Sequence, residues 1–281
     1  MDGARASRLT LTVEDEHTIA VGGAAESRLG VVAQVHLAID TGMRRVGSEP
    51  GRAVPLSRLV ASHPALELQG VFTHLPISDV PEGFDFTRAE LALFLETVAA
   101  IQDDRAVAGL PPVPMVHGGA YAAALAHDLT GLTMVRPGIL VYGLYPDPRT
   151  PRTVELRPAM TLKSRVSFVK RISRGETVGY GRSWQAPEDT WIATVPVGYA
   201  DGLSRATSNQ GRMLIRGRSY PIAGRVCMDQ TMLDLGPGIP EGGEPVTEVQ
   251  VGDEVTWLGR DGAEEITADE IAALTGTINY E

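Results

Sequence analysis

The chain has 281 residues, of which 43% are hydrophobic, and its 35 acidic and 25 basic residues leave a formal net charge of −10. This charge, with Lys and Arg scattered along the chain, excludes a protein that binds nucleic-acid phosphates through a basic surface. The sequence shows no apolar run of membrane-spanning length and no signal-peptide core, so we expect a cytoplasmic protein without membrane contact. Its single cysteine, Cys227, excludes an internal disulfide and a cysteine-rich metal centre.

The first part of the chain alternates predicted strands and helices. Apolar patterns predict strands at residues 9–13, 32–39, 66–74, 113–116 and 134–137, and helices at residues 14–28, 55–63, 86–102 and 120–125. Ser57 is one of several possible caps of the second helix, and Thr87 is the predicted cap of the third. This alternation predicts a parallel sheet, and polar residues at the strand ends predict a (β/α)8 TIM-type barrel. Because five strands can be counted, the prediction for residues 1–148 is a partial barrel.

The pattern changes after a linker rich in Pro and Arg at residues 146–158. Short predicted strands separated by turns follow at residues 161–172, 190–196, 213–215, 219–223, 231–235 and 254–258. A final helix is predicted at residues 267–274, with Thr267 as its cap and two acidic residues in its first turn, where the helix dipole favours them. Residues 149–281 are therefore predicted to form an antiparallel β domain.

Three compact motifs stand out in this second part. They read Val-Gly-Tyr-Gly-Arg at residues 178–182, Pro-Val-Gly-Tyr-Ala-Asp-Gly at 196–202 and Gly-Arg-Val-Cys-Met-Asp-Gln at 224–230. Glycines beside Tyr180 and Tyr199 free the backbone, so each ring can be presented on a turn. On this chemistry alone, a buried tyrosine with a satisfied hydroxyl is also possible. Taken together, the motifs resemble the C-terminal domain of alanine racemase, the barrel-type enzyme that uses pyridoxal phosphate (PLP).

The resemblance implies a two-base racemisation of alanine. One group removes the α-proton, another returns a proton to the opposite face, and PLP accepts the electrons. Tyr180 matches the family's tyrosine base. A phenol needs a pKa lowered by about 2 to 3 units to serve at neutral pH, and the resemblance assigns His74 and Arg136 as the adjacent cations. From the residues alone, His74 can equally close a strand, and Arg136 can pair with a carboxylate.

Arg136 also matches the family arginine that faces the pyridine nitrogen of PLP. Guanidinium donates a hydrogen bond but keeps its proton, so the ring is a weak electron sink and the carbanion is short-lived. This favours racemisation over transamination. It also argues against a decarboxylase of the same barrel class, which would place a carboxylate there.

Substrate contacts are implied on both parts of the chain. Arg45 matches the arginine near the substrate carboxylate, but Ala38 stands where the family often has a carbamylated lysine, so Arg45 needs another partner such as an anion. Tyr199, Cys227, Met228 and Asp229 match residues that the family lends across a dimer interface, with the Met228 amide on the substrate carboxylate. The resemblance thus implies a homodimer acting on a small amino acid, while Cys227 is assigned to packing.

The phosphate cradle matches only in part. Where the family has His-Ala-Ala-Asn-Ser opening a helix, this chain has His-Gly-Gly-Ala-Tyr at residues 117–121. Tyr121 is left to offer its hydroxyl in place of the serine, together with the backbone amides of Gly138 and Ile139. Tyr280 matches the family tyrosine that closes over the phosphate.

The PLP lysine of the family has no counterpart in the sequence. Lys163 and Lys170 are the only lysines, and both fall in the predicted β domain. We therefore expect a fragment of an alanine racemase that lacks the first strands of the barrel, the PLP lysine and the last strands of the C-terminal domain, and that is inactive alone. The alternatives are a non-catalytic dimerising remnant, one half of a split enzyme, or a racemase for another small amino acid such as serine.

Overall fold

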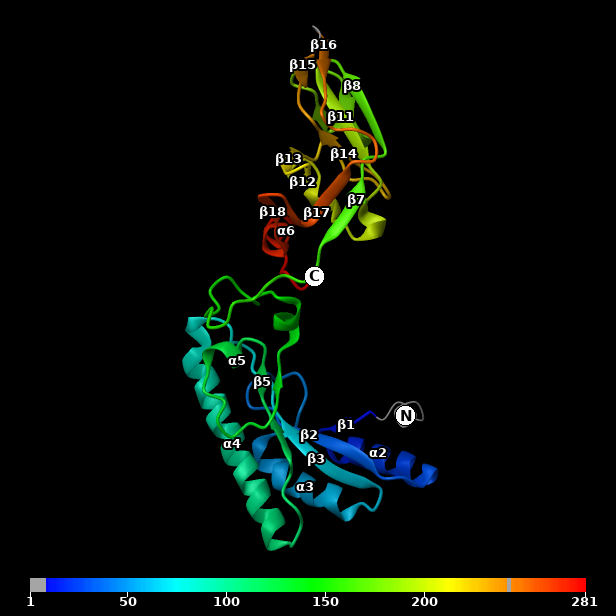
Figure 1. The fold of residues 1–281 in the computed structure, drawn as a ribbon. Helices are drawn as coiled ribbons and strands as arrows, with labels where there is room; N and C mark the ends of the chain where they lie inside the picture. Colours follow the sequence, from blue (N-terminus) through cyan, green and yellow to red (C-terminus); the bar gives the residue numbers. More distant parts are fainter. Residues whose placement is uncertain (1–8, 242–243) are drawn as a thin grey trace. The chain divides into compact units, whose positions relative to one another are not determined.

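A computed structural model describes residues 9–241 and 244–281, and the chain divides into two compact units, Met1–Arg157 and Pro158–Glu281 (Figure 1). Each unit has its own hydrophobic core.

The first unit is built on a four-stranded parallel sheet in the order β1-β2-β3-β4. These strands are β1 (Leu11–Val13), β2 (Ala33–Ala38), β3 (Leu66–Phe72) and β4 (Met115–His117). Two further short strands, β5 (Gly119–Ala120) and β6 (Val135–Arg136), pair with each other in parallel. The predicted strands and their parallel pairing are confirmed, with each strand shorter than its apolar pattern because the polar ends turn into loops.

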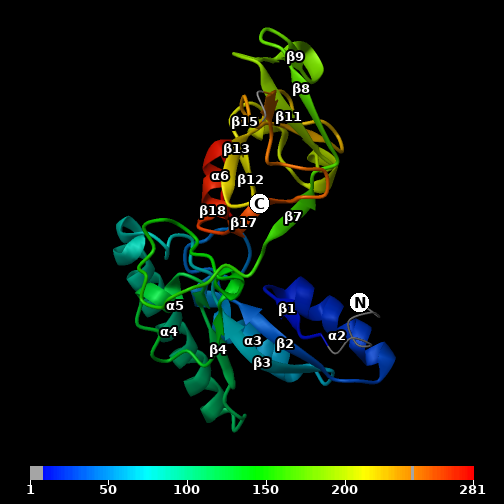
Figure 2. The same cartoon turned by 45° about the horizontal axis from the view of Figure 1, so that its top comes forward.

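Helices cover one face of this sheet. They are α2 (Glu16–Leu29), α3 (Ala53–Ser62) and α4 (Phe84–Val107), with the single turn of α5 (Ala123–Ala126) after β5 (Figure 2). The core between helices and sheet includes Val35, Leu37 and Val71 from the strands, and Leu56 and Phe94 from the helices. Side chains alternate across a strand, so the neighbours of these strand residues project from the opposite face.

Two predicted helix caps are wrong. Ser57 lies buried inside α3, and Thr87 lies inside α4, where its hydroxyl donates a hydrogen bond to the carbonyl of Ile77 at 3.1 Å. Both helices begin earlier than predicted because a 3-10 turn leads into each, η1 (Pro50–Arg52) and η2 (Pro81–Gly83). Proline at the first position of each turn presets the helical φ and needs no amide partner.

The second unit is an antiparallel β domain, as predicted. One sheet has the order β14-β11-β8, and a second has the order β13-β12-β17-β18 with β7 also paired to β17. The strands are β7 (Leu162–Arg165), β8 (Phe168–Ile172), β9 (Thr177–Val178), β10 (Trp184–Gln185), β11 (Thr190–Val195), β12 (Arg212–Ile215), β13 (Arg218–Pro221), β14 (Thr231–Asp234), β15 (Ile239–Glu241), β16 (Glu244–Val246), β17 (Glu254–Asp261) and β18 (Glu264–Ile266).

The strand predicted at residues 161–172 is in fact two strands in different sheets. Val166, which is 2% exposed, turns into the core and donates its amide to the carbonyl of Asp253, whereas Ser167 donates to Thr194. The chain therefore leaves the partner of β7 and joins the partner of β8 within two residues. The predicted final helix is confirmed as α6 (Ala268–Thr275), with the Thr267 hydroxyl accepting from the amide of Glu270 at 3.0 Å.

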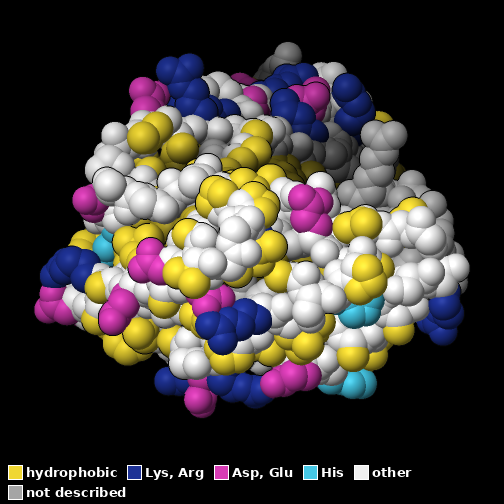
Figure 3. Space-filling model, turned by 90° about the horizontal axis from the view of Figure 1, so that it is seen from below, with side chains coloured by type: hydrophobic (Ala, Val, Ile, Leu, Met, Phe, Trp, Pro, Cys, Tyr) yellow, Lys and Arg dark blue, Asp and Glu magenta, His cyan; other side chains and the backbone are white. Residues whose placement is uncertain are grey.

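One face of the molecule carries charges of both signs (Figure 3). On the face drawn in Figure 3, Lys and Arg side chains are interspersed with Asp and Glu and do not gather into one patch. None of the helices within the described residues is long and apolar enough to cross a membrane.

Candidate active site

Arg136 is the centre of a polar cluster at the carboxyl ends of the parallel strands. Its Nη1 donates a short hydrogen bond to Nδ1 of His117, and its Nη2 donates to the carbonyl of Thr73 at 2.9 Å. The same Nη2 lies 3.5 Å from Nδ1 of His74, and Cζ lies 5.7 Å from the centre of the Phe72 ring. All of these partners are neutral, so the guanidinium keeps its charge uncompensated by any carboxylate within the described residues.

His117 is the most strongly perturbed base of the cluster. Its ring stacks on Phe72 with centroids 5.0 Å apart and planes at 5°, and its Nε2 lies 2.9 Å from Nδ1 of His36. Burial, then the charge of Arg136 and the neighbouring His36, lower the pKa of His117 to about 4. His117 is therefore neutral at pH 7 and can accept from Arg136. Neither His36 nor His117 was assigned a role from the sequence.

Arg45, His74 and Arg136 line one cavity of about 230 Å³, as their predicted positions at strand ends require. Ala38 lines the same cavity, so its methyl group lies beside Arg45 in the place expected for the supporting lysine. Asp40 is not that support, because its Oδ1 accepts the amides of Gly42 and Arg44 at 2.9 and 3.0 Å. Within the described residues Arg45 has no ion-pair partner, so no side chain there takes the place of the family lysine.

The surroundings of His74 oppose the positive charge expected of it. Burial lowers the pKa of His74, and the charges of Arg136 and Arg45 lower it further. The two arginines are the cations of this cavity. Burial lowers the pKa of Arg136 as well, but a guanidinium remains protonated in proteins.

Residues assigned to the phosphate also meet in the first unit. The amide of Tyr121 donates to the carbonyl of Arg136 at 2.9 Å. Gly138 has φ +51°, and a Cβ there would lie 3.4 Å from Cδ1 of Tyr121, so the tyrosine ring lies beside this glycine. Gly138 and Ile139 open the 3-10 turn η3 (Gly138–Tyr142), where amides have no partner inside the turn. A phenol hydroxyl and two such amides are donors suited to a phosphate, so this donor set fits PLP.

A second cavity, of about 440 Å³, lies wholly in the second unit. It brings together the predicted residues Tyr180, Tyr199, Met228 and Asp229 with Cys227, and it is also lined by Arg205, Arg225, Val226 and Gln230. Tyr180 is 72% exposed within its unit, so the alternative of a buried core tyrosine is excluded.

Glycines hold Tyr180 on its turn, as predicted. Gly179 and Gly181 both have φ +73°, a region that L side chains rarely adopt, and they flank the first residue of η4 (Tyr180–Arg182). A Cβ on Gly181 would also lie 2.9 Å from Nη1 of Arg225. The turn at Tyr180 therefore lies against Arg225.

The loops that carry Tyr199 and Met228 are bound to each other through their backbones. The amides of Tyr199 and Ala200 donate to the carbonyls of Cys227 and Met228 at 3.0 and 2.9 Å. Gly198 is required there, because a Cβ would lie 2.3 Å from the Cys227 carbonyl oxygen. Burial and the charge of Asp229 raise the pKa of Cys227, so its thiol is protonated at pH 7 and not a nucleophile.

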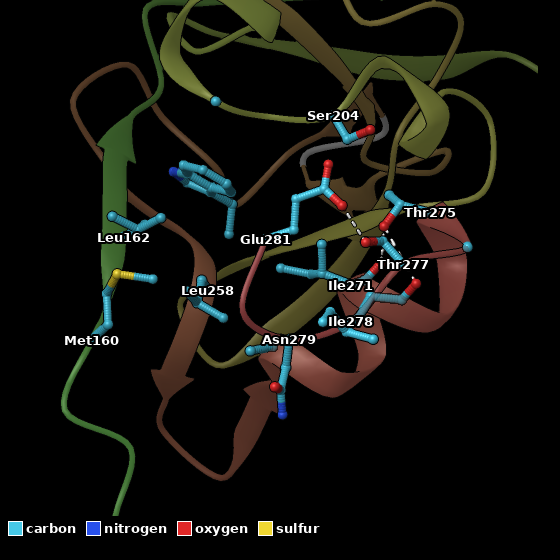
Figure 4. A pocket seen from close by; sticks show the side chains of 15 residues that line it. Met160, Leu162, Ser204, Leu258, Ile271, Thr275, Thr277, Ile278, Asn279 and Glu281 are labelled. Atoms are coloured by element: carbon cyan, nitrogen blue, oxygen red, sulfur yellow. Dashed lines mark hydrogen bonds between the residues drawn. The ribbon is translucent and has the colours of Figure 1, made fainter. Parts of the chain in front are cut away.

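A third cavity, of about 460 Å³, is lined by apolar and polar residues, which include Leu162 of β7, Trp257 and Leu258 of β17, Ile271 of α6, and Ile278 and Glu281 near the end of the sequence (Figure 4). None of the predicted site residues lines it, and Tyr280 lines none of these three cavities. Both lysines lie on strands of the second unit, Lys163 in an ion pair with Glu254, and neither lines these cavities. Across residues 9–241 and 244–281, no three His, Cys, Asp or Glu side chains are placed to hold a metal ion.

Comparison with known protein families decides the relationship. The family model "Alanine racemase, N-terminal domain" matches residues 1–146, and "Alanine racemase, C-terminal domain" matches residues 159–281. The chain belongs to the alanine racemase family. It is 48% identical over 281 residues to the alanine racemase of Cutibacterium acnes, covering 100% of this chain and 71% of that protein. To the alanine racemase of Symbiobacterium thermophilum it is 42% identical over 254 residues, covering 90% of this chain and 64% of that protein.

Solved structures agree with this assignment. The crystal structure of alanine racemase from E. faecalis superimposes with a TM-score of 0.86 at 32% identity, covering 99% of this chain and 71% of that one. The histidine racemase of Leuconostoc mesenteroides gives a TM-score of 0.84 at 28% identity, covering 99% and 70%. The fold is therefore shared with the alanine racemases, a family of isomerases that combine a TIM barrel with a C-terminal β domain.

Proposed function

We propose that the chain carries the tyrosine half of a PLP-dependent racemisation of alanine. The observation that supports this most is the environment of Arg136, whose guanidinium is held by His117 and Thr73 without a carboxylate among the described residues. Such a group donates a hydrogen bond to a pyridine nitrogen but does not protonate it. PLP bound there would accept the electrons released at Cα only weakly, which suits proton exchange better than transamination.

Other predicted site residues of the first unit are proposed to bind and orient the cofactor and the substrate. The amides of Gly138 and Ile139 and the hydroxyl of Tyr121 hold the phosphate, with Tyr280 of the second unit as a further phosphate contact. Arg45 attracts the substrate carboxylate, helped by the absence of an ion-pair partner within the described residues. His74 serves as a neutral hydrogen-bonding neighbour of Arg136 and not as a cation.

Tyr180 is proposed to take and return the α-proton. The family resemblance assigns Tyr199, Met228 and Asp229 to the site of a partner subunit, and Tyr180 shares their cavity. All four residues therefore belong to the same site. We propose a homodimer in which the second unit of one subunit completes the active site on the first unit of the other. The Met228 amide, which has no acceptor within the described residues, would bind the substrate carboxylate.

Among the described residues, the cavity of Arg136 and the cavity of Tyr180 contain no lysine amine that could attach PLP covalently or act as the second base. Lys163 and Lys170 lie outside both of them. We therefore propose that the chain alone does not racemise alanine, and that a small amine such as methylamine restores part of the activity by acting in place of the lysine.

Purified chain with PLP and L-alanine, with and without methylamine, tests this proposal by optical rotation. Racemisation that methylamine restores and that Tyr180→Phe abolishes supports the proposal. Full racemisation without any added amine contradicts the proposal that the chain depends on an external amine. Serine and histidine are measured beside alanine, because the fold is shared with a histidine racemase. A dimer that binds no PLP would instead favour the non-catalytic alternative.

A further inference from the structure

His36 lies on β2, on the face opposite the helix-covered core. The register between β2 and β3 shifts at this point, from Val35 opposite Leu68 to His36 opposite Gly70. A Cβ on Gly70 would lie 2.6 Å from the Cδ2 and Nε2 atoms of His36, so the imidazole rests directly on the glycine backbone. The register shift and the absence of a side chain at Gly70 therefore position the His36 ring, and a larger residue at position 70 would clash with it.

The ring of His36 contacts His117, and Arg136, His117 and His36 are joined by two hydrogen bonds, each of which has one possible direction. Arg136 has only donors, so Nδ1 of His117 must be the acceptor and carries no proton. A neutral His117 then carries its proton on Nε2, which lies 2.9 Å from Nδ1 of His36. His36 must accept at that atom, and its own proton is on Nε2.

We propose that His36 is a positioning residue that acts on Arg136 through His117. By accepting from Nε2–H it holds His117 in the one tautomer whose Nδ1 can receive the guanidinium. If His117 moved its proton to Nδ1, two donors would face each other, and Arg136 would lose one of its two closest anchors. This proposal rests on the proposed function for its catalytic consequence, but the tautomer itself is a property of the chain.

Two substitutions of similar shape separate the acceptor from packing. In His36→Asn the Oδ1 atom occupies the position of Nδ1 and can still accept, whereas His36→Leu puts a methyl group there. Both variants keep the branch at Cγ and fill similar space over Gly70. Circular dichroism and thermal melts confirm that each variant folds.

The decisive readout is nitrogen-15 NMR of histidine-labelled chain without PLP or substrate. His117 is identified among the six histidines by the loss of its signals in His117→Asn. We expect two well-separated ring-nitrogen shifts of a fixed Nε2–H tautomer in wild type and in His36→Asn, and shifts that move toward each other in His36→Leu. A fixed tautomer in His36→Leu, a Nδ1–H tautomer in wild type, or equal disturbance in both variants overturns the proposal.

Amine-restored racemisation supplies the second readout. We expect kcat to fall about tenfold in His36→Leu and less than about twofold in His36→Asn, as for the loss of one hydrogen bond to a charged network. If no variant and no wild-type chain shows activity, the proposed function fails, and the NMR result still decides the role of His36.

Discussion

Arg136 and His117 share a hydrogen bond in which only the arginine can be the donor. The bond joins β6 to the end of β4, and the carbonyl of Thr73 at the end of β3 holds the other guanidinium nitrogen. A cation buried among neutral acceptors is costly to place, so the folded chain must keep His117 uncharged to retain it.

This requirement predicts that the chain loses stability in mild acid. The folded-state pKa of His117, about 4, lies below its ordinary value of 6.5, so unfolding takes up a proton between these pH values. The contribution is fully present above pH 6.5 and is lost as the pH falls toward 4. In His117→Asn the Oδ1 still accepts from Arg136 but does not titrate. We expect thermal melts at pH 7.5 and pH 5 to differ less for this variant than for wild type. His17→Asn, at an exposed position of α2, is the control and should leave the wild-type difference unchanged.

The buried carboxyl group of Glu90 should instead make the chain less stable as the pH rises. Glu90 is 3% exposed, its carboxyl group has no hydrogen-bond partner within the described residues, and the pKa of that group is raised to about 7, chiefly by burial and then by Asp40. Its contribution to stability is present below pH 4.5 and is lost as the pH rises through 7. We expect Glu90→Gln to be more stable than wild type at pH 8, by about 1 to 3 kcal/mol in urea unfolding, and close to it at pH 5. A variant less stable than wild type at pH 8 would show that the carboxylate has a partner.

Gly70 is expected to tolerate no side chain. In Gly70→Ala the new methyl group would displace the His36 ring, and we expect a loss of about 1 to 3 kcal/mol in urea unfolding. Gly22→Ala in α2 is the matched control, because its Cβ meets no atom within 4 Å and alanine favours a helix. Adding His36→Ala to Gly70→Ala should recover part of the loss, and no recovery would place the clash elsewhere.

Tyr180 and Gly181 are expected to separate chemistry from stability. Tyr180→Phe removes a hydroxyl from an exposed ring, so the free energy of unfolding should change by less than about 0.5 kcal/mol, while amine-restored racemisation should be lost. Gly181→Ala forces a side chain into φ +73° and toward Arg225, so both stability and activity should fall. Retained activity in Tyr180→Phe would exclude the tyrosine as the base.

Local sequence determined much of the fold and part of the site. Strands and helices of the first unit follow from apolar period, and the turn that presents Tyr180 follows from its flanking glycines, because both are properties of a few neighbouring residues. Arg45, His74 and Arg136 could be expected to meet because the carboxyl ends of parallel strands lie at one edge.

Only the tertiary structure decided the partners of Arg136. His36 and His117 are 81 residues apart, and they touch because a register shift places His36 over Gly70 while β3 pairs Phe72 with His117. The lowered pKa of His74 likewise depends on its burial and on two arginines from other segments of the chain. No local pattern encodes such contacts, because strand register and desolvation arise from the whole sheet once it has assembled.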